Sequence, residues 1–159
     1  MYYTRGQITD GTFSSIERAG MDGSRPSSII TGLNYPHKIV IDFHNSRLYW
    51  AGWGDDTVKS SAMCGTDIQI VSRRPGESGT SGIGVYGSRL YWTNYFTKML
   101  ESSTLTGQDV QLLYSSESNL EGLTIVPRLD LPNNRSNDCA GRTCSKICVL
   151  APSSFRCLS

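Results

Sequence analysis

Short apolar runs alternate with clusters of Gly, Asn, Asp and Ser along most of the chain. Residues 39–43 form a β-branched run, and residues 47–50 follow it after a polar turn. Two further runs, 57–62 and 68–71, are separated by a turn around Gly65. Runs of this length, bounded by turn residues, are typical of β-strands, so four short strands are predicted. Because no segment keeps an apolar period of 3.6 residues, we expect helix in less than about 10% of the residues.

The same pattern returns after 42 residues. Residues 46–50 read Ser-Arg-Leu-Tyr-Trp, and residues 88–92 repeat those five residues. Three further series keep this spacing: Gly23, Gly65 and Gly107; Ile41, Ile83 and Ile125; and Ile16, Val58 and Leu100, each followed by a charged residue, Glu17, Lys59 or Glu101. A pitch of about 40–45 residues with four strands is typical of a β-propeller blade. The fold class predicted for this region is therefore all-β, a partial propeller of about three four-stranded blades.

Two of these series have a physical interpretation. The recurrent glycine lies where the third strand turns into the fourth, and a tight hairpin there needs positive φ. The isoleucines lie on the innermost strand, which packs between neighbouring blades. For Ile41→Ala we expect a loss of about 2–5 kcal/mol of stability.

The number of blades is incomplete. The first blade runs from Tyr2 to about Thr31 and lacks its inner strand, whereas blades at about 38–73 and 81–115 are complete. Residues 120–126 are predicted as an isolated inner strand. Because propellers close with at least four blades, we expect the missing blades of a parent protein to precede Met1 and to be partners of this chain. Because the blades are incomplete, we expect five apolar residues at their edges to be exposed to water: Ile16, Ile29, Ile30, Leu123 and Ile125. Exposed apolar edges favour association with other chains.

Charge and composition exclude several protein classes. The 15 basic and 14 acidic residues give a net charge of +1, which argues against a nucleic-acid partner. With 38% hydrophobic and 18% charged residues, the chain is too apolar for a disordered protein. It has no run of about 18 apolar residues, so no transmembrane span is expected. No signal peptide is expected either, because the first residues lack an apolar stretch.

The cysteines are unevenly distributed. Cys139, Cys144, Cys148 and Cys157 fall in the last 21 residues, and only Cys64 lies elsewhere. Such density predicts a small disulfide module in an oxidising compartment, and four cysteines allow three pairings. A secreted module without a signal peptide is explained most simply by a fragment of a longer extracellular protein. Cys64 corresponds to a hairpin corner, where we expect an exposed free or intermolecular thiol.

Three segments resemble the YWTD (class B) repeats of the low-density lipoprotein receptor family. They are Leu-Tyr-Trp-Thr-Asn at 90–94, the run 16–24, and Gly-Leu-Asn-Tyr-Pro at 32–36 leading into 39–42. The resemblance covers residues 1–127. It implies part of a six-bladed propeller that is followed by an epidermal-growth-factor-like (EGF-like) module.

The family arrangement assigns residues 128–136 to a linker and 137–159 to a truncated EGF-like module. It implies the disulfides Cys139–Cys148 and Cys144–Cys157, without calcium. The fourth position of YWTD, where the family aspartate joins neighbouring blades by hydrogen bonds, holds Arg5, Gly52 and Asn94 here. We therefore expect weaker hydrogen bonding between the blades.

Catalytic and metal sites are not expected. His37 and His44 are the only histidines, and no G-x-S-x-G nucleophile motif accompanies them. Asp55 and Asp56 could bind a cation, but adjacent carboxylates in a Gly-rich turn are more often a solvated loop. We predict no enzyme, no cofactor and no small-molecule substrate. Asn134 begins an Asn-Arg-Ser sequon and is a predicted glycosylation site.

A ligand-binding face is predicted from the order of the strands. Loops between the second and third strands share one face with the loops that lead into each new blade. They carry Asn34, Tyr35, His37, Trp53, Asp55, Asp56, Arg73, Arg74, Glu77, Tyr95 and Phe96. Aromatic and Arg side chains are typical of protein-binding hot spots. The alternative for Trp53 is a structural role, since the family usually has an aromatic residue there.

The resemblance implies a non-enzymatic extracellular module of a receptor related to the low-density lipoprotein receptor. It would bind secreted or cell-surface proteins at the outer face of the plasma membrane, for endocytosis or for reception of Wnt-type signals. The alternative is a nidogen-like basement-membrane matrix protein. A propeller hydrolase or a fragment without function is a more remote alternative.

Overall fold

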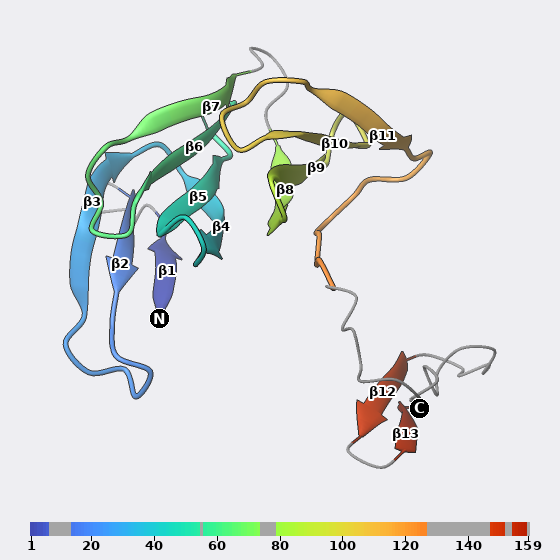
Figure 1. Ribbon diagram of the computed structural model, residues 1–159, viewed down its shortest axis with the longest axis horizontal. Helices are drawn as coiled ribbons and strands as arrows, with labels where there is room; N and C mark the ends of the chain where they lie inside the picture. The colour runs from blue at the N-terminus through green and yellow to red at the C-terminus, as the bar shows by residue number, and fades with distance from the viewer. Residues whose placement is uncertain (7–13, 55, 74–78, 127–146, 152–153, 159) are drawn as a thin grey trace. The chain divides into compact units, whose positions relative to one another are not determined.

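The computed structural model describes residues 1–6, 14–54, 56–73, 79–126, 147–151 and 154–158. The chain divides into two compact parts, residues 1–126 and 127–159. Every regular element in the described residues is a β-strand, which confirms the all-β prediction (Figure 1). No described helix could span a membrane.

The first part consists of three antiparallel sheets, one for each predicted blade. Blade 1 contains β1 (Tyr2–Arg5), β2 (Ser14–Arg18) and β3 (Ser27–Leu33). Blade 2 contains β4 (Pro36–Asp42), β5 (Arg47–Gly52), β6 (Thr57–Ala62) and β7 (Gln69–Arg73). Blade 3 contains β8 (Thr80–Tyr86), β9 (Arg89–Asn94), β10 (Met99–Thr104) and β11 (Gln111–Ser115). Strands that follow one another in sequence pair within each sheet, so the predicted three-stranded first blade and four-stranded later blades are confirmed.

The recurrent glycine occupies the turn between the last two strands of each blade. Its φ is +82° at Gly23, +89° at Gly65 and +82° at Gly107. An L side chain rarely adopts this backbone conformation, whereas glycine does so without a steric penalty. The positive φ expected from the sequence is therefore confirmed.

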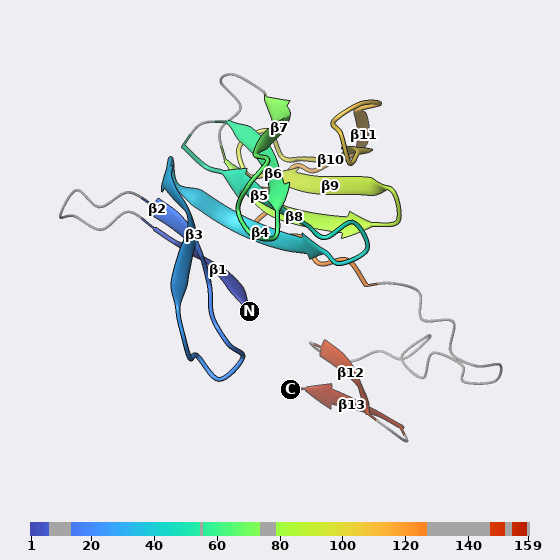
Figure 2. The same ribbon diagram turned by 60° about the vertical axis from the view of Figure 1, so that its left-hand side comes forward.

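The core lies between neighbouring blades. Figure 2 shows β4 of blade 2 beside β8 of blade 3, and β1 of blade 1 also contacts β4. The cluster between blades 1 and 2 is built on Ile16, Ile30, Leu48 and Trp50. The cluster between blades 2 and 3 is built on Tyr49, Val58, Val71, Ile83, Leu90 and Trp92. Each repeated Leu-Tyr-Trp run is thus an interior strand segment.

The prediction that Ile16 and Ile30 of the first blade are exposed is wrong. Ile16 and Ile30 are buried, with exposed fractions of 0% and 5%. They lie on the face of blade 1 that blade 2 covers. The predicted core isoleucines differ in depth: Ile83 is buried, and Ile41 is partly buried against the first cluster.

The segment 120–126 does not form the predicted inner strand. It packs along β8, where a side chain on Gly82 or Gly84 would overlap Leu123 or Ile125. The Ser81 hydroxyl donates a hydrogen bond to the carbonyl of Leu120. A strand needs a ladder of backbone hydrogen bonds, and no described strand pairs with this segment.

The second part contains one described hairpin. Strands β12 (Ile147–Ala151) and β13 (Ser154–Leu158) are antiparallel, and Cys148 lies opposite Cys157 in their register. Cys139, Cys144, Asn134 and the linker 128–136 lie outside the described residues. The disulfide pairing, the glycosylation site and the EGF-like module therefore remain predictions.

Candidate functional site

Four predicted ligand-face residues form one group of rings, which we call the aromatic cluster: His37, Trp53, Tyr95 and Phe96. The ring centroids of His37 and Trp53 are 5.0 Å apart, and those of Trp53 and Phe96 are 5.9 Å apart. Tyr95 contacts both Trp53 and Phe96, at 6.2 and 5.2 Å. Most of these pairs are edge-to-face, the geometry that aromatic quadrupoles favour. Side chains from blades 2 and 3 thus share one surface.

Backbone hydrogen bonds hold the loops that carry the cluster. The N–H of Trp53 donates to the carbonyl of Tyr35 at 2.9 Å, and the N–H of Tyr95 donates to that of Gly79 at 2.8 Å. These bonds join the end of the second strand to the segment that leads into the same blade. The repeat therefore places Trp53 and Tyr95 equivalently in blades 2 and 3.

Asn94 and Gly79 determine where Phe96 lies. The buried Asn94 accepts hydrogen bonds from the N–H groups of Phe96 and Thr97, each at 2.9 Å. A Cβ on Gly79 would be 2.5 Å from the Phe96 ring, and φ at this glycine is +101°. The ring can approach the backbone only because position 79 has no side chain. Asn94, at the fourth YWTD position, thus organises the loop of its own blade.

An open depression adjoins the aromatic cluster. It is lined by Asn34, Tyr35, His37, Trp53 and Gly54. The Asn34 side chain donates to the Gly54 carbonyl at 2.7 Å and closes one side. Tyr35 is 47% exposed beside it, and Phe96 is 58% exposed. The surface therefore presents aromatic area to solvent on anchored loops.

His37 is the titratable member of the cluster. Burial lowers its pKa, and the charge of Lys38 lowers it further, while the backbone of Thr80 has the opposite effect. Its Nδ1 is buried and has no hydrogen-bond partner in the described part of the chain. A pKa below the ordinary value of 6.5 keeps the ring neutral at pH 7. The aromatic cluster is therefore uncharged under physiological conditions.

The remaining predicted site residues are not members of the aromatic cluster. Asp55, Arg74 and Glu77 lie outside the described residues, and Arg73 is exposed at the end of β7. Cys64 is an exposed free cysteine, and the nearby Thr66 hydroxyl lowers the pKa of its thiol. No group of three His, Cys, Asp or Glu residues suited to a metal ion occurs among the described residues.

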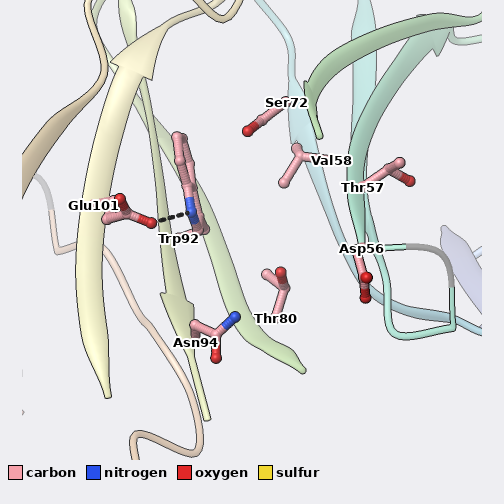
Figure 3. Close-up of a pocket in the computed structure, with 8 residues that line it drawn as sticks. All are labelled: Asp56, Thr57, Val58, Ser72, Thr80, Trp92, Asn94 and Glu101. Carbon is pink, nitrogen blue, oxygen red and sulfur yellow. Dashed lines mark hydrogen bonds between the residues drawn. The ribbon is translucent and has the colours of Figure 1, made fainter. Parts of the chain in front are cut away.

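A buried polar pocket between blades 2 and 3 was not anticipated from the sequence (Figure 3). It is lined by Asp56, Thr57, Val58 and Ser72 on one side and by Thr80, Trp92, Asn94 and Glu101 on the other. Trp92 Nε1 donates to Glu101 Oε2 at 3.1 Å, and Glu101 is only 4% exposed. The volume of about 10 Å³ suffices for roughly one water molecule, so the pocket does not suit a larger ligand.

Blade 1 has a related pair at the same position. The Tyr3 hydroxyl donates to Glu17 Oε2 at 2.7 Å, and this bond is the main reason that the pKa of Glu17 is lowered. In blade 2 the residue opposite Trp50 is Lys59. The sequence signal for this pocket was the charged residue that follows Ile16, Val58 and Leu100. Its burial could not be deduced from spacing.

Comparison with known proteins supports the resemblance. No protein-family model matches the chain. A vitellogenin receptor of Solenopsis invicta is 39% identical over 62 residues, which cover 38% of this chain and 4% of the receptor. A chain in the crystal structure of a nidogen/laminin complex matches with a TM-score of 0.63 and 26% identity, over 69% of this chain and 43% of that one. The three blades are similar to class B repeats of the low-density lipoprotein receptor family and have the fold of the propeller in the nidogen/laminin complex. The aromatic cluster spans the two complete blades of this propeller region.

Proposed function

We propose that this chain is a non-enzymatic, extracellular receptor-type module that binds protein ligands. The binding surface is the aromatic cluster with Tyr35, extended by Asp55, Arg73 and Arg74. One observation carries the proposal: Tyr35 and Phe96 are 47% and 58% exposed beside a depression whose loops are held by backbone hydrogen bonds.

The physical chemistry of this surface suits protein binding. Aromatic side chains bury a large area on binding and lose few rotatable bonds, and they are enriched among interface hot spots. The hydrogen bonds of Trp53, Tyr95 and Asn94 organise the loops beforehand, which lowers the entropic cost of binding. The neutral His37 leaves the centre apolar, and the Arg side chains would supply a charged rim.

The similar proteins support the receptor interpretation. One is named a receptor, and the other belongs to a nidogen/laminin complex. We favour a cell-surface receptor over a matrix protein because the higher identity, 39% against 26%, is with the receptor. We therefore propose endocytic uptake of a protein ligand ahead of reception of Wnt-type signals.

Binding measurements by surface plasmon resonance would test this function, with vitellogenin and laminin as the two probes. We expect vitellogenin to bind, and Phe96→Ser and Tyr35→Ser each to weaken binding by about tenfold or more. Phe43→Ser is the matched control, because Phe43 is 77% exposed in the turn between β4 and β5. Binding of laminin alone would favour the matrix alternative. Binding of neither protein, or equal affinity in all variants, would contradict the proposal.

The C-terminal region is proposed to be an EGF-like spacer with the disulfides Cys139–Cys148 and Cys144–Cys157. Labelling of the unreduced, denatured protein should then modify one thiol, Cys64. Because the hairpin register sets Cys148 opposite Cys157, peptide mapping must distinguish that pairing from the proposed one. Glycosylation of Asn134 would appear as a mass increase after secretion, removed by an N-glycosidase.

A further inference from the structure

The outer strands of blades 1 and 2 present different side chains to the blade that follows. In blade 1, Ile30 lies opposite Ile16 and is buried in the cluster between blades 1 and 2. In blade 2 the matching position, opposite Val58, holds Ser72. Ser72 lines the polar pocket between blades 2 and 3. Because serine is much smaller than isoleucine, a place that an aliphatic side chain fills at the first interface adjoins a pocket at the second.

Two further positions around this pocket can form side-chain hydrogen bonds only at the interface between blades 2 and 3. Thr80 lies opposite Asn94 there, and both residues line the pocket. The register of blade 2 puts Pro36 opposite Gly52 at the matching positions. Neither proline nor glycine has a side chain that donates or accepts a hydrogen bond. The polar lining therefore belongs to this one interface and is not a general consequence of the repeat.

Hydroxyl groups from both blades line this pocket. Figure 3 shows Ser72 on the side of blade 2 and Thr80 on the side of blade 3. The structure shows no hydrogen bond from either hydroxyl to another described residue. Thr80 is only 6% exposed, and a buried hydroxyl without a hydrogen-bond partner is costly. Both hydroxyls therefore need a partner that lies in the pocket itself.

Glu101 supplies a hydrogen-bond acceptor on the side of blade 3. Its Oε2 accepts from Trp92 Nε1 at 3.1 Å. A carboxylate has about four lone-pair sites, so the same group can accept further hydrogen bonds. The pocket volume of about 10 Å³ suits one water molecule, which can donate to a carboxylate and also bind two hydroxyls. Polar pockets of this size hold water, whereas dry cavities in proteins are apolar.

We propose that one water molecule is bound in this pocket and bridges Ser72 of blade 2 to Thr80 and Glu101 of blade 3. These residues give the water three hydrogen-bond partners, the usual number for a buried water. The bridge supplies hydrogen bonding between these two blades although Asn94 stands at the fourth YWTD position. This inference goes beyond the proposed ligand binding and does not depend on it.

NMR spectroscopy of NOEs between water and the full chain tests for the bound molecule directly. We expect cross-peaks between water and the methyl protons of Val58, which line the pocket and do not exchange with solvent. Their sign should be that of a slowly exchanging water, unlike cross-peaks from Val110, which is 43% exposed. A crystal structure should show one water oxygen within hydrogen-bond distance of Ser72, Thr80 and Glu101.

Substitutions at Ser72 separate filling of the pocket from loss of one hydroxyl. Ser72→Ile introduces the side chain that occupies the matching position of blade 1, so it should displace the water and abolish the Val58 cross-peaks. Ser72→Ala is the matched control, because it removes the hydroxyl but keeps the space. The cross-peaks should remain in Ser72→Ala. The amide spectrum of each variant shows whether it is folded.

Unfolding in urea gives a second measurement that does not need the larger side chain. Thr80→Val keeps the shape of the side chain and removes the hydroxyl on blade 3. One bridging water would couple this hydroxyl to that of Ser72. The double variant Ser72→Ala/Thr80→Val should therefore lower the urea midpoint by less than the sum of the two single variants.

Several outcomes would overturn the proposal. They are the absence of Val58 cross-peaks from the unmodified chain, cross-peaks that persist in folded Ser72→Ile, and strictly additive losses in urea. A metal ion at this place in a crystal structure would also contradict it. None of these measurements involves a protein ligand, so the bridge and the proposed binding function can fail separately.

Discussion

The two interfaces between blades share one plan but differ in polarity. Each has a turn glycine on an outer-strand carbonyl, an aliphatic residue beside it, and a buried Trp from the second strand of the later blade. In the interface between blades 2 and 3, Trp92 donates to the buried Glu101. In the interface between blades 1 and 2, Trp50 lies opposite Lys59, which can only donate.

A comparison of the two interfaces shows which contacts recur in each repeat. Apolar burial and the close approach at glycine recur at both interfaces, because a change in volume or backbone conformation there cannot be absorbed by a packed core. The residue opposite the Trp changes between blades, from Lys59 to Glu101, so its hydrogen bond is not a contact that the repeat preserves.

The largest effect should come from the turn glycines. In Gly107→Ala the new Cβ overlaps the Val71 carbonyl and also occupies a positive-φ position. Positive φ costs about 1–2 kcal/mol and overpacking about 1–3 kcal/mol, so we expect a total loss of about 2–5 kcal/mol in urea unfolding.

Gly23→Ala is the matched control for this measurement. It has the same φ of +82° but open space at the Cβ, so only the conformational cost of about 1–2 kcal/mol is expected. Equal losses in the two variants would show that the contact with Val71 is unimportant.

The next largest difference in stability is expected between substitutions of Trp92 and of Trp50. Trp92→Phe removes the donor to Glu101 as well as ring volume, whereas Trp50→Phe removes volume opposite a lysine. Because a hydrogen bond to a charged group is worth about 1.5–3 kcal/mol, Trp92→Phe should be the more destabilising by about that amount. Thermal and urea unfolding of both variants would measure it. A larger loss for Trp50→Phe would contradict the role of Glu101.

The hydrogen bond between Tyr3 and Glu17 in blade 1 should affect the titration of Glu17. Tyr3→Phe removes the donor that chiefly lowers the pKa of Glu17, so this pKa should rise toward its ordinary value of 4.5. A depressed folded-state pKa stabilises the protein above the unfolded pKa, and the stabilisation is lost as pH falls through the folded value. The variant should therefore lose less stability on acidification below 4.5 than the unmodified chain. NMR titration of the Glu17 carboxyl would measure the shift, and the hydrogen bonds from Arg5 and Ser15 should keep part of it.

The smallest effect is expected at a contact that the two complete blades share. Arg47 donates to Asp67 at 2.7 Å, and Arg89 donates to Asp109 at 2.8 Å, both at the surface. Arg47→Met and Arg89→Met should each lower the melting temperature slightly and to the same extent. Added salt should reduce both effects, because exposed ion pairs are screened. Unequal losses would show that the blades differ at this position.

Much of the fold could be predicted because the information is local or periodic. The turn glycines and the strands of blades 2 and 3 follow from short runs and from the pitch of 42 residues. The segment 120–126 has a strand pattern but does not form a strand, since hydrogen-bonding partners are not a property of the segment itself. For the candidate site, strand order predicted which loops share a face. The ring contacts of Trp53 with His37 and Phe96 depend on two blades meeting, and no spacing encodes that distance.

The amino-acid sequence by itself determined the repeat, the all-β character and the resemblance to class B propellers, because these depend on residue type and spacing along one chain. Only the tertiary structure decided which face of each blade is covered. Ile16 and Met21 are both apolar residues of blade 1, yet one is 0% and the other 85% exposed. Burial of Glu101 beside Trp92 was decided in the same way. Exposure depends on the neighbouring sheet, and the side chains of a strand point alternately to its two faces without indicating which face a neighbour will cover.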